Sequence, residues 1–192
     1  MTGAVARNVH WTEEEYITVE AGSAIKHEYF DGEVYAMAGA KSRHNVIAAN
    51  LTAALVNIVS GGSCHVFNSD QRIHAEAPRK FYTYADGGVA CGEWQISDKD
   101  GMSLENPVLL FEVLSSSTRE YDRGAKLLLY RQIPSLVDVL LIDQPEQLIE
   151  HHRRGAGGWR STTRYRGAIS ILGGVVRFED IYNLPPGLPW EG

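Results

Sequence analysis

Two kinds of local pattern predict helices in this chain: capping signals, and apolar residues at three- and four-residue steps. Thr12, with Glu15 three residues later, forms a capping box that opens a short first helix, on which Glu28 is expected. Apolar side chains at helical spacing predict a longer helix that begins at Ser42 and ends at Gly61-Gly62. A third helix is predicted over residues 122–132.

Runs of β-branched and aromatic residues between turn residues predict strands. These runs cover residues 33–38, 64–75, 81–91, 108–114 and 137–142, and a β-hairpin is expected over 147–166. Helices and strands in this order predict an α/β (α+β) fold, in which helices flank a mixed β-sheet. The proline-rich segment 183–192 is expected to form a C-terminal tail along the surface.

Glu112 stands out because it interrupts an otherwise apolar strand. In residues 107–114, six of the seven residues after the proline are large and apolar. An ionised carboxylate in such surroundings costs several kcal/mol unless a cation or hydrogen-bond donors meet it. Three interpretations remain open at this point: a structural ion pair, a strand end that opens to solvent at residues 115–118, or a catalytic centre.

Length and composition narrow the class of protein. The 192 residues, of which 44% are hydrophobic, suit one domain over 1–192. No run of the sequence approaches the ~18 apolar residues of a membrane helix, and the first five residues lack a secretory layout, so a cytoplasmic protein is expected. Cys64 and Cys91 lack zinc-site spacing and are interpreted as reduced core thiols rather than a disulfide. Any metal is therefore expected to have oxygen ligands.

The charge is unevenly distributed. A net charge of −6 argues against a general nucleic-acid coat protein. The segment 151–166 is nevertheless basic, and one interpretation is a contact with a nucleic-acid backbone. A solvated hairpin is the favoured alternative, because Gly155-Ala156-Gly157-Gly158 forms a turn. The arginines of this segment are Arg153, Arg154, Arg160, Arg164 and Arg166.

Three further side chains can join Glu112 in a catalytic centre. Asp86 ends a run on a neighbouring strand, so the two carboxylates are expected to share one hard cation. Mg²⁺, with Mn²⁺ as the alternative, suits two carboxylates, the carbonyl of Val113 and several waters. Lys126, on the following helix, would orient the attacking water and stabilise charge on a phosphate. Glu28 would be a third acidic contact to the metal or its waters.

Each candidate also has a structural interpretation. Asp86 precedes a glycine, and Asp-Gly is a turn dipeptide. Lys126 can form an ordinary surface pair with Asp122. Glu28 can be solvated among its acidic neighbours. His44, near the start of the long helix, is either a partly exposed residue or a contact for phosphate or a base.

Ordered blocks of residues along nearly the whole chain carry a more specific signal. The blocks are Trp11–Tyr16, His27–Ala40, Arg43-His44, Ser69-Asp70, Tyr82–Asp86, Asn106–Val108, Glu112–Ser115, Tyr121–Lys126 and Tyr130-Arg131. Together they resemble the Uma family of restriction endonucleases, a branch of the PD-(D/E)XK nuclease-like superfamily. The resemblance therefore covers all the candidate site residues.

The resemblance implies a metal-dependent endonuclease that hydrolyses phosphodiester bonds in DNA. It implies a restriction-endonuclease-like mixed sheet with an additional β-hairpin. Asp86 and Glu112 would be the metal-binding acids, Lys126 the catalytic lysine and Glu28 the helical acid. A homodimer is implied because a duplex has two strands to cut, and neither an organic cofactor nor a membrane partner is expected.

Two departures from the family pattern bear on the site. Ala85 and Gly87-Gly88 replace the usual proline and apolar residue around the first acid, which predicts a looser strand there. Leu114 stands two residues after Glu112, where the motif has its lysine, so Lys126 would take over that role. The alternative from another class is a catalytically inactive nuclease-fold module that binds nucleic acid or a protein partner.

Overall fold

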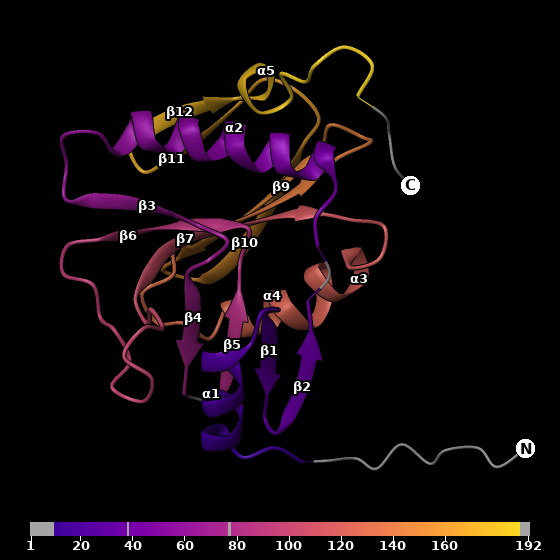
Figure 1. Cartoon of the computed structure of the whole chain (residues 1–192). Coiled ribbons are helices and arrows are strands. Elements are labelled where there is room, and N and C mark those ends of the chain that lie inside the picture. The colour runs from indigo at the N-terminus through magenta and orange to yellow at the C-terminus, as the bar shows by residue number, and fades with distance from the viewer. Residues whose placement is uncertain (1–9, 38, 77, 189–192) are drawn as a thin grey trace, which may run out of the picture.

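A six-stranded mixed sheet forms the centre of the computed structural model, which describes residues 10–37, 39–76 and 78–188 (Figure 1). Its strands are β3 (Cys64–Asn68), β6 (Gly87–Cys91), β7 (Pro107–Leu114), β8 (Asp138–Asp143), β9 (Ile149–Gly155) and β10 (Gly158–Arg164). They lie in the order β10-β9-β8-β7-β6-β3. β7 and β8 are parallel, and the other neighbours are antiparallel. This mixed sheet with flanking helices confirms the predicted fold class.

A second sheet is four-stranded and antiparallel. It contains β1 (His27–Phe30), β2 (Glu33–Ala36), β4 (Arg72–Ala75) and β5 (Phe81–Tyr84), in the order β2-β1-β5-β4. Helix α1 (Glu13–Gly22) covers one face, where Tyr16 packs against Tyr29 and Tyr82. The predicted capping box at the start of α1 is confirmed, because Thr12 and Glu15 exchange both hydrogen bonds.

Helices cover both faces of the six-stranded sheet. Helix α2 (Ser42–Val59) packs on one face, where Ile47 belongs to the same core cluster as Leu109 and Phe111. The crossover from β7 to β8 consists of α3 (Arg119–Tyr121), the π-helical turn η1 (Asp122–Lys126) and α4 (Leu127–Tyr130). It belongs to the second core cluster, with Leu110 and Leu114. Because side chains alternate along a strand, Glu112 faces the crossover.

Glu28 is a correction to the predicted elements. It lies on β1, not on the first helix, which ends at Gly22. Asp31 (φ 42°) and Gly32 (φ 97°) form a two-residue turn between β1 and β2, and both have the positive φ of a type I′ hairpin. Asp-Gly is a dipeptide typical of such turns, and the hairpin requires a strand before it, which the sequence patterns did not predict.

Two predicted strands are each divided between the two sheets. The segment 64–75 forms β3 in the six-stranded sheet and β4 in the four-stranded sheet, and 81–91 forms β5 and β6 in the same way. The chain changes sheet at residues 69–71 and again at Ala85-Asp86. The long helix, β7, β8 and the β9–β10 hairpin match their predictions within a few residues. The predicted strand 33–38 ends at Ala36, and residue 38 lies outside the described residues.

The cysteine prediction is wrong. Cys64 and Cys91 lie directly opposite each other in the β3–β6 register and form a disulfide. The sequence could not reveal this pairing, because it depends on a register between strands that are 27 residues apart. Within the described residues, none of the helices combines the length and apolar character needed to cross a membrane.

The C-terminal part contains three elements that the sequence patterns did not predict. β11 (Ala168–Ile171) and β12 (Gly174–Arg177) form a two-stranded sheet, and helix α5 (Phe178–Ile181) follows. Ile169, Val176 and Ile181 join the core cluster of α2, so these elements cover that helix. Leu184, in the predicted tail, also packs against this cluster, and residues 189–192 lie outside the described part of the chain.

Candidate active site

Glu112 is buried in the middle of β7, with 4% of its surface exposed. Burial raises the pKa of its carboxyl group well above the ordinary value, the Lys126 ammonium opposes this rise, and the carboxylates of Asp86 and Asp122 add to it. The hydroxyl of Tyr130 donates a hydrogen bond to Glu112 Oε1. A protonated carboxyl or a nearby cation is therefore required at this position.

Lys126 supplies such a cation. Its side chain leaves the π-helical turn η1 and is almost fully buried. The ammonium nitrogen lies 3.0 Å from Glu112 Oε1, 3.1 Å from Glu28 Oε1 and 3.0 Å from the carbonyl oxygen of Tyr84. Burial alone would lower the pKa of Lys126, but Glu112, Tyr130 and Glu28 raise it well above the ordinary value. The lysine is therefore protonated at neutral pH.

Glu28 holds this lysine from the other sheet. β1 places it opposite Thr83 when the Tyr29–Tyr82 register is extended by one residue. Thr83 donates a hydrogen bond to Glu28 Oε1, and the Tyr121 hydroxyl lies 3.1 Å from Oε2. Both carboxylate oxygens of Glu28 thus have partners, and the residue links the four-stranded sheet to the crossover helix.

Asp86 lies where the chain passes from β5 to β6. The antiparallel register pairs Gly87 with Phe111, and one further step places Asp86 opposite Glu112. Asp86 Oδ2 accepts a hydrogen bond of 2.7 Å from the backbone amide of Val113 and lies 3.0 Å from His44 Nε2. Burial lowers the pKa of His44, but the hydrogen bond and the charge of Asp86, with Asn45 and Asp122, together raise it above the ordinary value.

The two glycines after Asp86 correct the expectation of a loose strand. Gly87 and Gly88 are buried in β6. A Cβ atom at Gly87 would lie 2.6 Å from the Phe111 ring, and one at Gly88 would lie 2.5 Å from the carbonyl oxygen of Leu109. Glycine is therefore needed for the close approach of β6 to β7, which holds Asp86 beside Glu112.

The charge of this cluster fits a hard divalent cation. Asp122 is a third buried carboxylate, after Glu28 and Glu112, and burial raises its pKa above the ordinary value. These three acids act on the ammonium of Lys126, and the half-buried carboxylate of Asp86 lies beside Glu112. Mg²⁺ prefers one or two carboxylates together with backbone oxygen and water, so Asp86 and Glu112 are a suitable donor pair. Glu28 suits the role less well, because Lys126 and two hydroxyl groups already occupy its oxygens.

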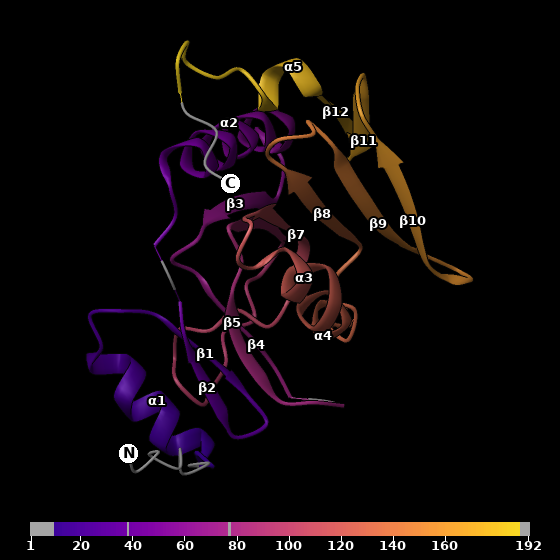
Figure 2. The ribbon, with the colours of Figure 1, turned by 90° about the vertical axis from the view of Figure 1, so that its right-hand side faces the viewer.

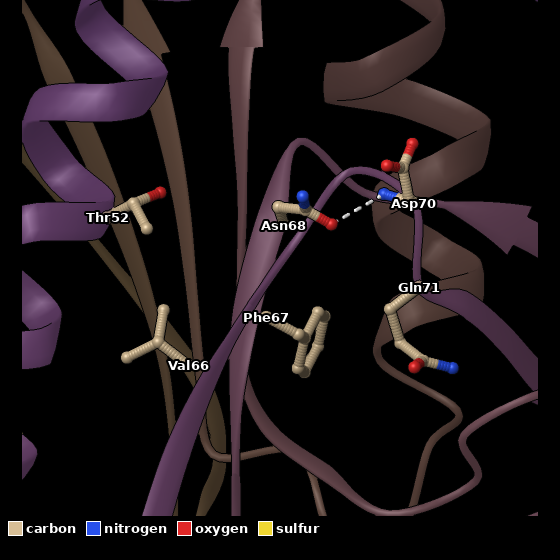
Figure 3. Close-up of a pocket in the computed structure, with 6 residues that line it drawn as sticks. All are labelled: Thr52, Val66, Phe67, Asn68, Asp70 and Gln71. Carbon is tan, nitrogen blue, oxygen red and sulfur yellow. Dashed lines mark hydrogen bonds between the residues drawn. The ribbon is translucent and has the colours of Figure 1, made fainter.

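A surface hollow of about 430 Å³ lies between α2 and the turn that connects β3 with β4 (Figure 3). Asn68 accepts a hydrogen bond of 3.0 Å from the amide of Asp70 there, and it lies opposite Gly87 in the β3–β6 register. The hollow is therefore near Asp86, although none of its lining residues is a candidate catalytic group. The lining residues are Thr52, Val66, Phe67, Asn68, Asp70 and Gln71.

Residues 13–179 match the model of the family Uma2, described as "Putative restriction endonuclease". The chain belongs to the Uma2 family. This confirms the resemblance inferred from the sequence blocks, and the match includes all the candidate residues of the Uma2 site: Glu28, Asp86, Glu112, Val113 and Lys126.

Similar proteins are consistent with this Uma2 assignment. The chain is 39% identical to the uncharacterized protein slr1290 of Synechocystis sp. over 147 residues, which are 76% of each chain. It is 35% identical to the uncharacterized protein sll1609 of the same organism over 143 residues, which are 74% of this chain and 80% of that protein. A crystal structure described as a putative nuclease belonging to DUF820 from Anabaena variabilis has the same fold, with a TM-score of 0.72 and 14% identity over 88% of this chain and 96% of that one.

Sequence reasoning named the residues that the Uma2 fold brings together, but not the contacts between them. Lys126 reaches both Glu28 and Glu112, and Asp86 is held against β7. The hydroxyls of Thr83, Tyr121 and Tyr130 were missed as partners of the acids. Tyr130 had a detectable signal, because it stands four residues after Lys126 and so on the same helical face.

Proposed function

We propose that the chain is a metal-dependent endonuclease that hydrolyses phosphodiester bonds in DNA. The observation that carries this proposal is the buried ammonium of Lys126 between Glu28 and Glu112, with Asp86 on the adjoining strand. Buried carboxylates with perturbed pKa values beside a lysine are a common arrangement in catalytic centres. Membership of the Uma2 family supports the same chemistry.

Asp86 and Glu112, together with the carbonyl oxygen of Val113, would hold Mg²⁺ or Mn²⁺. The ion would polarise the phosphate and lower the pKa of a bound water. Burial raises the pKa of Glu112, and a divalent cation beside it would favour the ionised form. No organic cofactor is needed for this reaction.

The other residues position the reacting groups. Lys126 would orient the attacking water and stabilise negative charge on the phosphate. Glu28 holds the ammonium of Lys126, and His44 holds Asp86 at a distance of 3.0 Å. Tyr130 restrains Glu112 through its hydroxyl. These contacts fix the acids before a substrate arrives, which is what electrostatic preorganisation requires.

One observation favours a second function, a catalytically inactive nuclease-fold module that binds nucleic acid or a protein partner. An ammonium group has three donor hydrogens, and Lys126 has three acceptors within 3.1 Å: Glu28, Glu112 and the Tyr84 carbonyl. In this arrangement no donor is left for a water or a phosphate. Catalysis would therefore require a bound metal ion to draw Glu112 away from Lys126. If the ion pair has only a structural role, no such movement is needed.

The substrate and the assembly follow from the proposed reaction. DNA is the proposed substrate, and cleavage of both strands of a duplex favours a homodimer. Light scattering should then give twice the chain mass of 21.2 kDa. A cytoplasmic location is part of the proposal, because cellular DNA is reached there.

The direct test is cleavage of supercoiled plasmid and of short single-stranded DNA in Mg²⁺ or Mn²⁺. We compare the parent chain with Glu112→Gln and Lys126→Met, and use Glu14→Gln, an exposed glutamate, as the control. Cleavage by the parent and by the control, lost in both site variants, is the expected result. A parent that binds DNA without cutting it, or cleavage that persists in both site variants, would favour the binding module.

A further inference from the structure

A second cluster of metal-binding residues lies away from the candidate active site. Glu13, His74 and Glu76 place three ligand atoms within 4.8 Å of one another, the one such group found among residues 10–37, 39–76 and 78–188. The cluster lies on the α1 face of the four-stranded sheet, because His74 stacks on Tyr82, which packs against α1. Thr83, which follows Tyr82 on β5, points to the opposite face of the sheet, where it contacts Glu28 of the candidate active site.

His74 is oriented as a metal ligand would be. It is 2% exposed, and its Nδ1 lies 2.7 Å from Glu105 Oε1. A carboxylate can only accept, so in the neutral ring Nδ1 carries the proton and Nε2 keeps its lone pair. Nε2 is buried without a hydrogen-bond partner and faces Glu76 Oε2 at 3.3 Å and Glu13 Oε1 at 3.7 Å.

The spacing of these atoms suits a tetrahedral metal ion. Zinc–ligand bonds of about 2.0–2.2 Å separate two ligand atoms by roughly 3.3–3.6 Å. The separations of 3.3 and 3.7 Å from His74 Nε2 are close to this range. A carboxylate that holds the second nitrogen of a metal-binding histidine, as Glu105 does, is a common feature of zinc sites. Glu76, with a side chain that is 54% exposed, leaves the site open to solvent.

We propose that Glu13, His74 and Glu76 bind a divalent transition-metal ion such as Zn²⁺, with Glu105 orienting the histidine. A donor set that contains an imidazole favours such an ion over Mg²⁺. The ion links the start of α1 to the end of β4, so it stabilises the packing of that helix on the sheet. This site is separate from the carboxylates of the candidate nuclease centre and does not depend on its activity.

Two lysines set the strength of this site. Lys80 and Lys99 lie 2.7 and 3.0 Å from Glu13 Oε2, and 3.3 and 3.5 Å from Glu76 Oε1. The lysines thus contact the oxygens that do not face His74. With a neutral histidine, the three acids Glu13, Glu76 and Glu105 and the two lysines carry a net charge of −1. The lysines weaken metal binding, and removal of one should strengthen it.

The test is a titration of the full chain with Zn²⁺ by calorimetry, in excess Mg²⁺ so that the oxygen-only site is saturated. The parent should bind one Zn²⁺ at this site. His74→Gln and Glu76→Gln should lose this binding, and Lys99→Met should strengthen it several-fold. His65→Gln replaces an exposed histidine on β3 and should bind like the parent.

The visible spectrum with Co²⁺ gives an independent readout. A nitrogen and oxygen donor set at the site gives absorption bands in the parent that Glu76→Gln removes. Because Glu76 is exposed, this variant keeps the test valid even if His74→Gln fails to fold. A parent that binds no Zn²⁺, or Zn²⁺ binding that is unchanged in Glu76→Gln, would overturn the proposal and leave an ion-pair network with a protonated histidine.

Discussion

At the scale of single residues, Lys126 determines the electrostatics of the candidate active site. Its ammonium contacts the carboxylates of Glu28 and Glu112 in surroundings that water barely reaches. A buried ion pair contributes little net stability compared with apolar packing, but removal of one partner leaves an uncompensated buried charge. The lysine is therefore important for folding as well as for the proposed reaction.

Replacement of this lysine should be costly for stability. Lys126→Met removes the cation from Glu28 and Glu112, and we expect the free energy of unfolding to fall by about 3–5 kcal/mol at pH 7. The loss should be smaller at pH 5, because Glu112 then takes up a proton and no longer carries an unpaired buried charge. Urea denaturation at both pH values measures this. Arg160→Met, at an exposed position, should change stability little, and an equally small effect of Lys126→Met would contradict the ion-pair account.

The raised pKa of Glu112 predicts how stability depends on pH. Between the ordinary value of 4.5 and the higher folded-state pKa, the folded chain holds a proton that the unfolded chain has released. Stability in EDTA should therefore decrease as pH rises through this interval, by at most about 1.4 kcal/mol per pH unit. Lys126 does not make stability depend on pH between pH 5 and 8, because its contribution to stability is fully present below the ordinary lysine pKa of 10.5.

Glu112→Gln removes this titration. The stability of the variant relative to the parent should rise from pH 5 to pH 8, as measured by urea denaturation in EDTA. Glu14→Gln, at an exposed position, should follow the parent at every pH. Parallel pH profiles for the parent and Glu112→Gln would show that the carboxyl group of Glu112 does not titrate in this range.

At the scale of elements, the contact between β6 and β7 positions the two acids. A Cβ atom at position 88 would lie 2.5 Å from both the Leu109 carbonyl oxygen and the Phe67 ring. Gly88→Ala should lower the free energy of unfolding by about 1–3 kcal/mol, because the backbone of β7 cannot move away freely. Gly22→Ala, at the end of α1 with open space around it, should be neutral or slightly stabilising. Equal stabilities of the two variants in urea denaturation would contradict this packing.

The sequence predicted elements well where the signal is local. Helix α2 has an apolar stripe, β7 and β8 are mostly apolar, and the β9–β10 hairpin contains a glycine-rich turn. The changes of sheet at 69–71 and 85–86 were not predicted, because they depend on which distant strand each half joins. The disulfide and the position of Glu28 on β1 were missed for the same reason.

The site was predictable to a similar extent. The family resemblance named Asp86, Glu112, Lys126 and Glu28. The fold brings Glu112, Lys126 and Glu28 into one ion-pair cluster and places Asp86 beside it. Which hydroxyl groups restrain the acids could not be predicted, because Thr83 comes from the other sheet. That residues 1–192 form a single domain stays a prediction.

At the scale of the whole molecule, the basic hairpin of β9 and β10 forms one edge of the six-stranded sheet (Figure 2), and its arginines fall into two groups. Arg154 donates to the carbonyl oxygens of Arg131 and Ile133 and therefore has a structural role. Arg164 and Arg166 are exposed. β10 ends at Arg164, opposite the first residue of β9, at the sheet end where β7 and β8 finish. These two arginines are therefore the better candidates for contact with a DNA backbone.

This placement predicts a change in the salt dependence of DNA binding. Replacement of Arg164 and Arg166 by glutamine should reduce affinity for all sequences and decrease the slope of log K against log salt by about 2. Fluorescence anisotropy in Ca²⁺, over a series of salt concentrations, measures this. Arg160→Gln, on the same strand but toward the turn, is the control. An unchanged slope in the double variant would exclude the hairpin from the DNA interface.

The central claim is that Asp86 and Glu112 form a cation site, and Mg²⁺ binding tests it most directly because no substrate needs to be known. Calorimetric titration of the parent should show one Mg²⁺ per chain at this site. Asp86→Asn and Glu112→Gln should abolish this binding, and His74→Gln should retain it. A parent that binds no Mg²⁺, or variants that bind it as the parent does, would contradict the account.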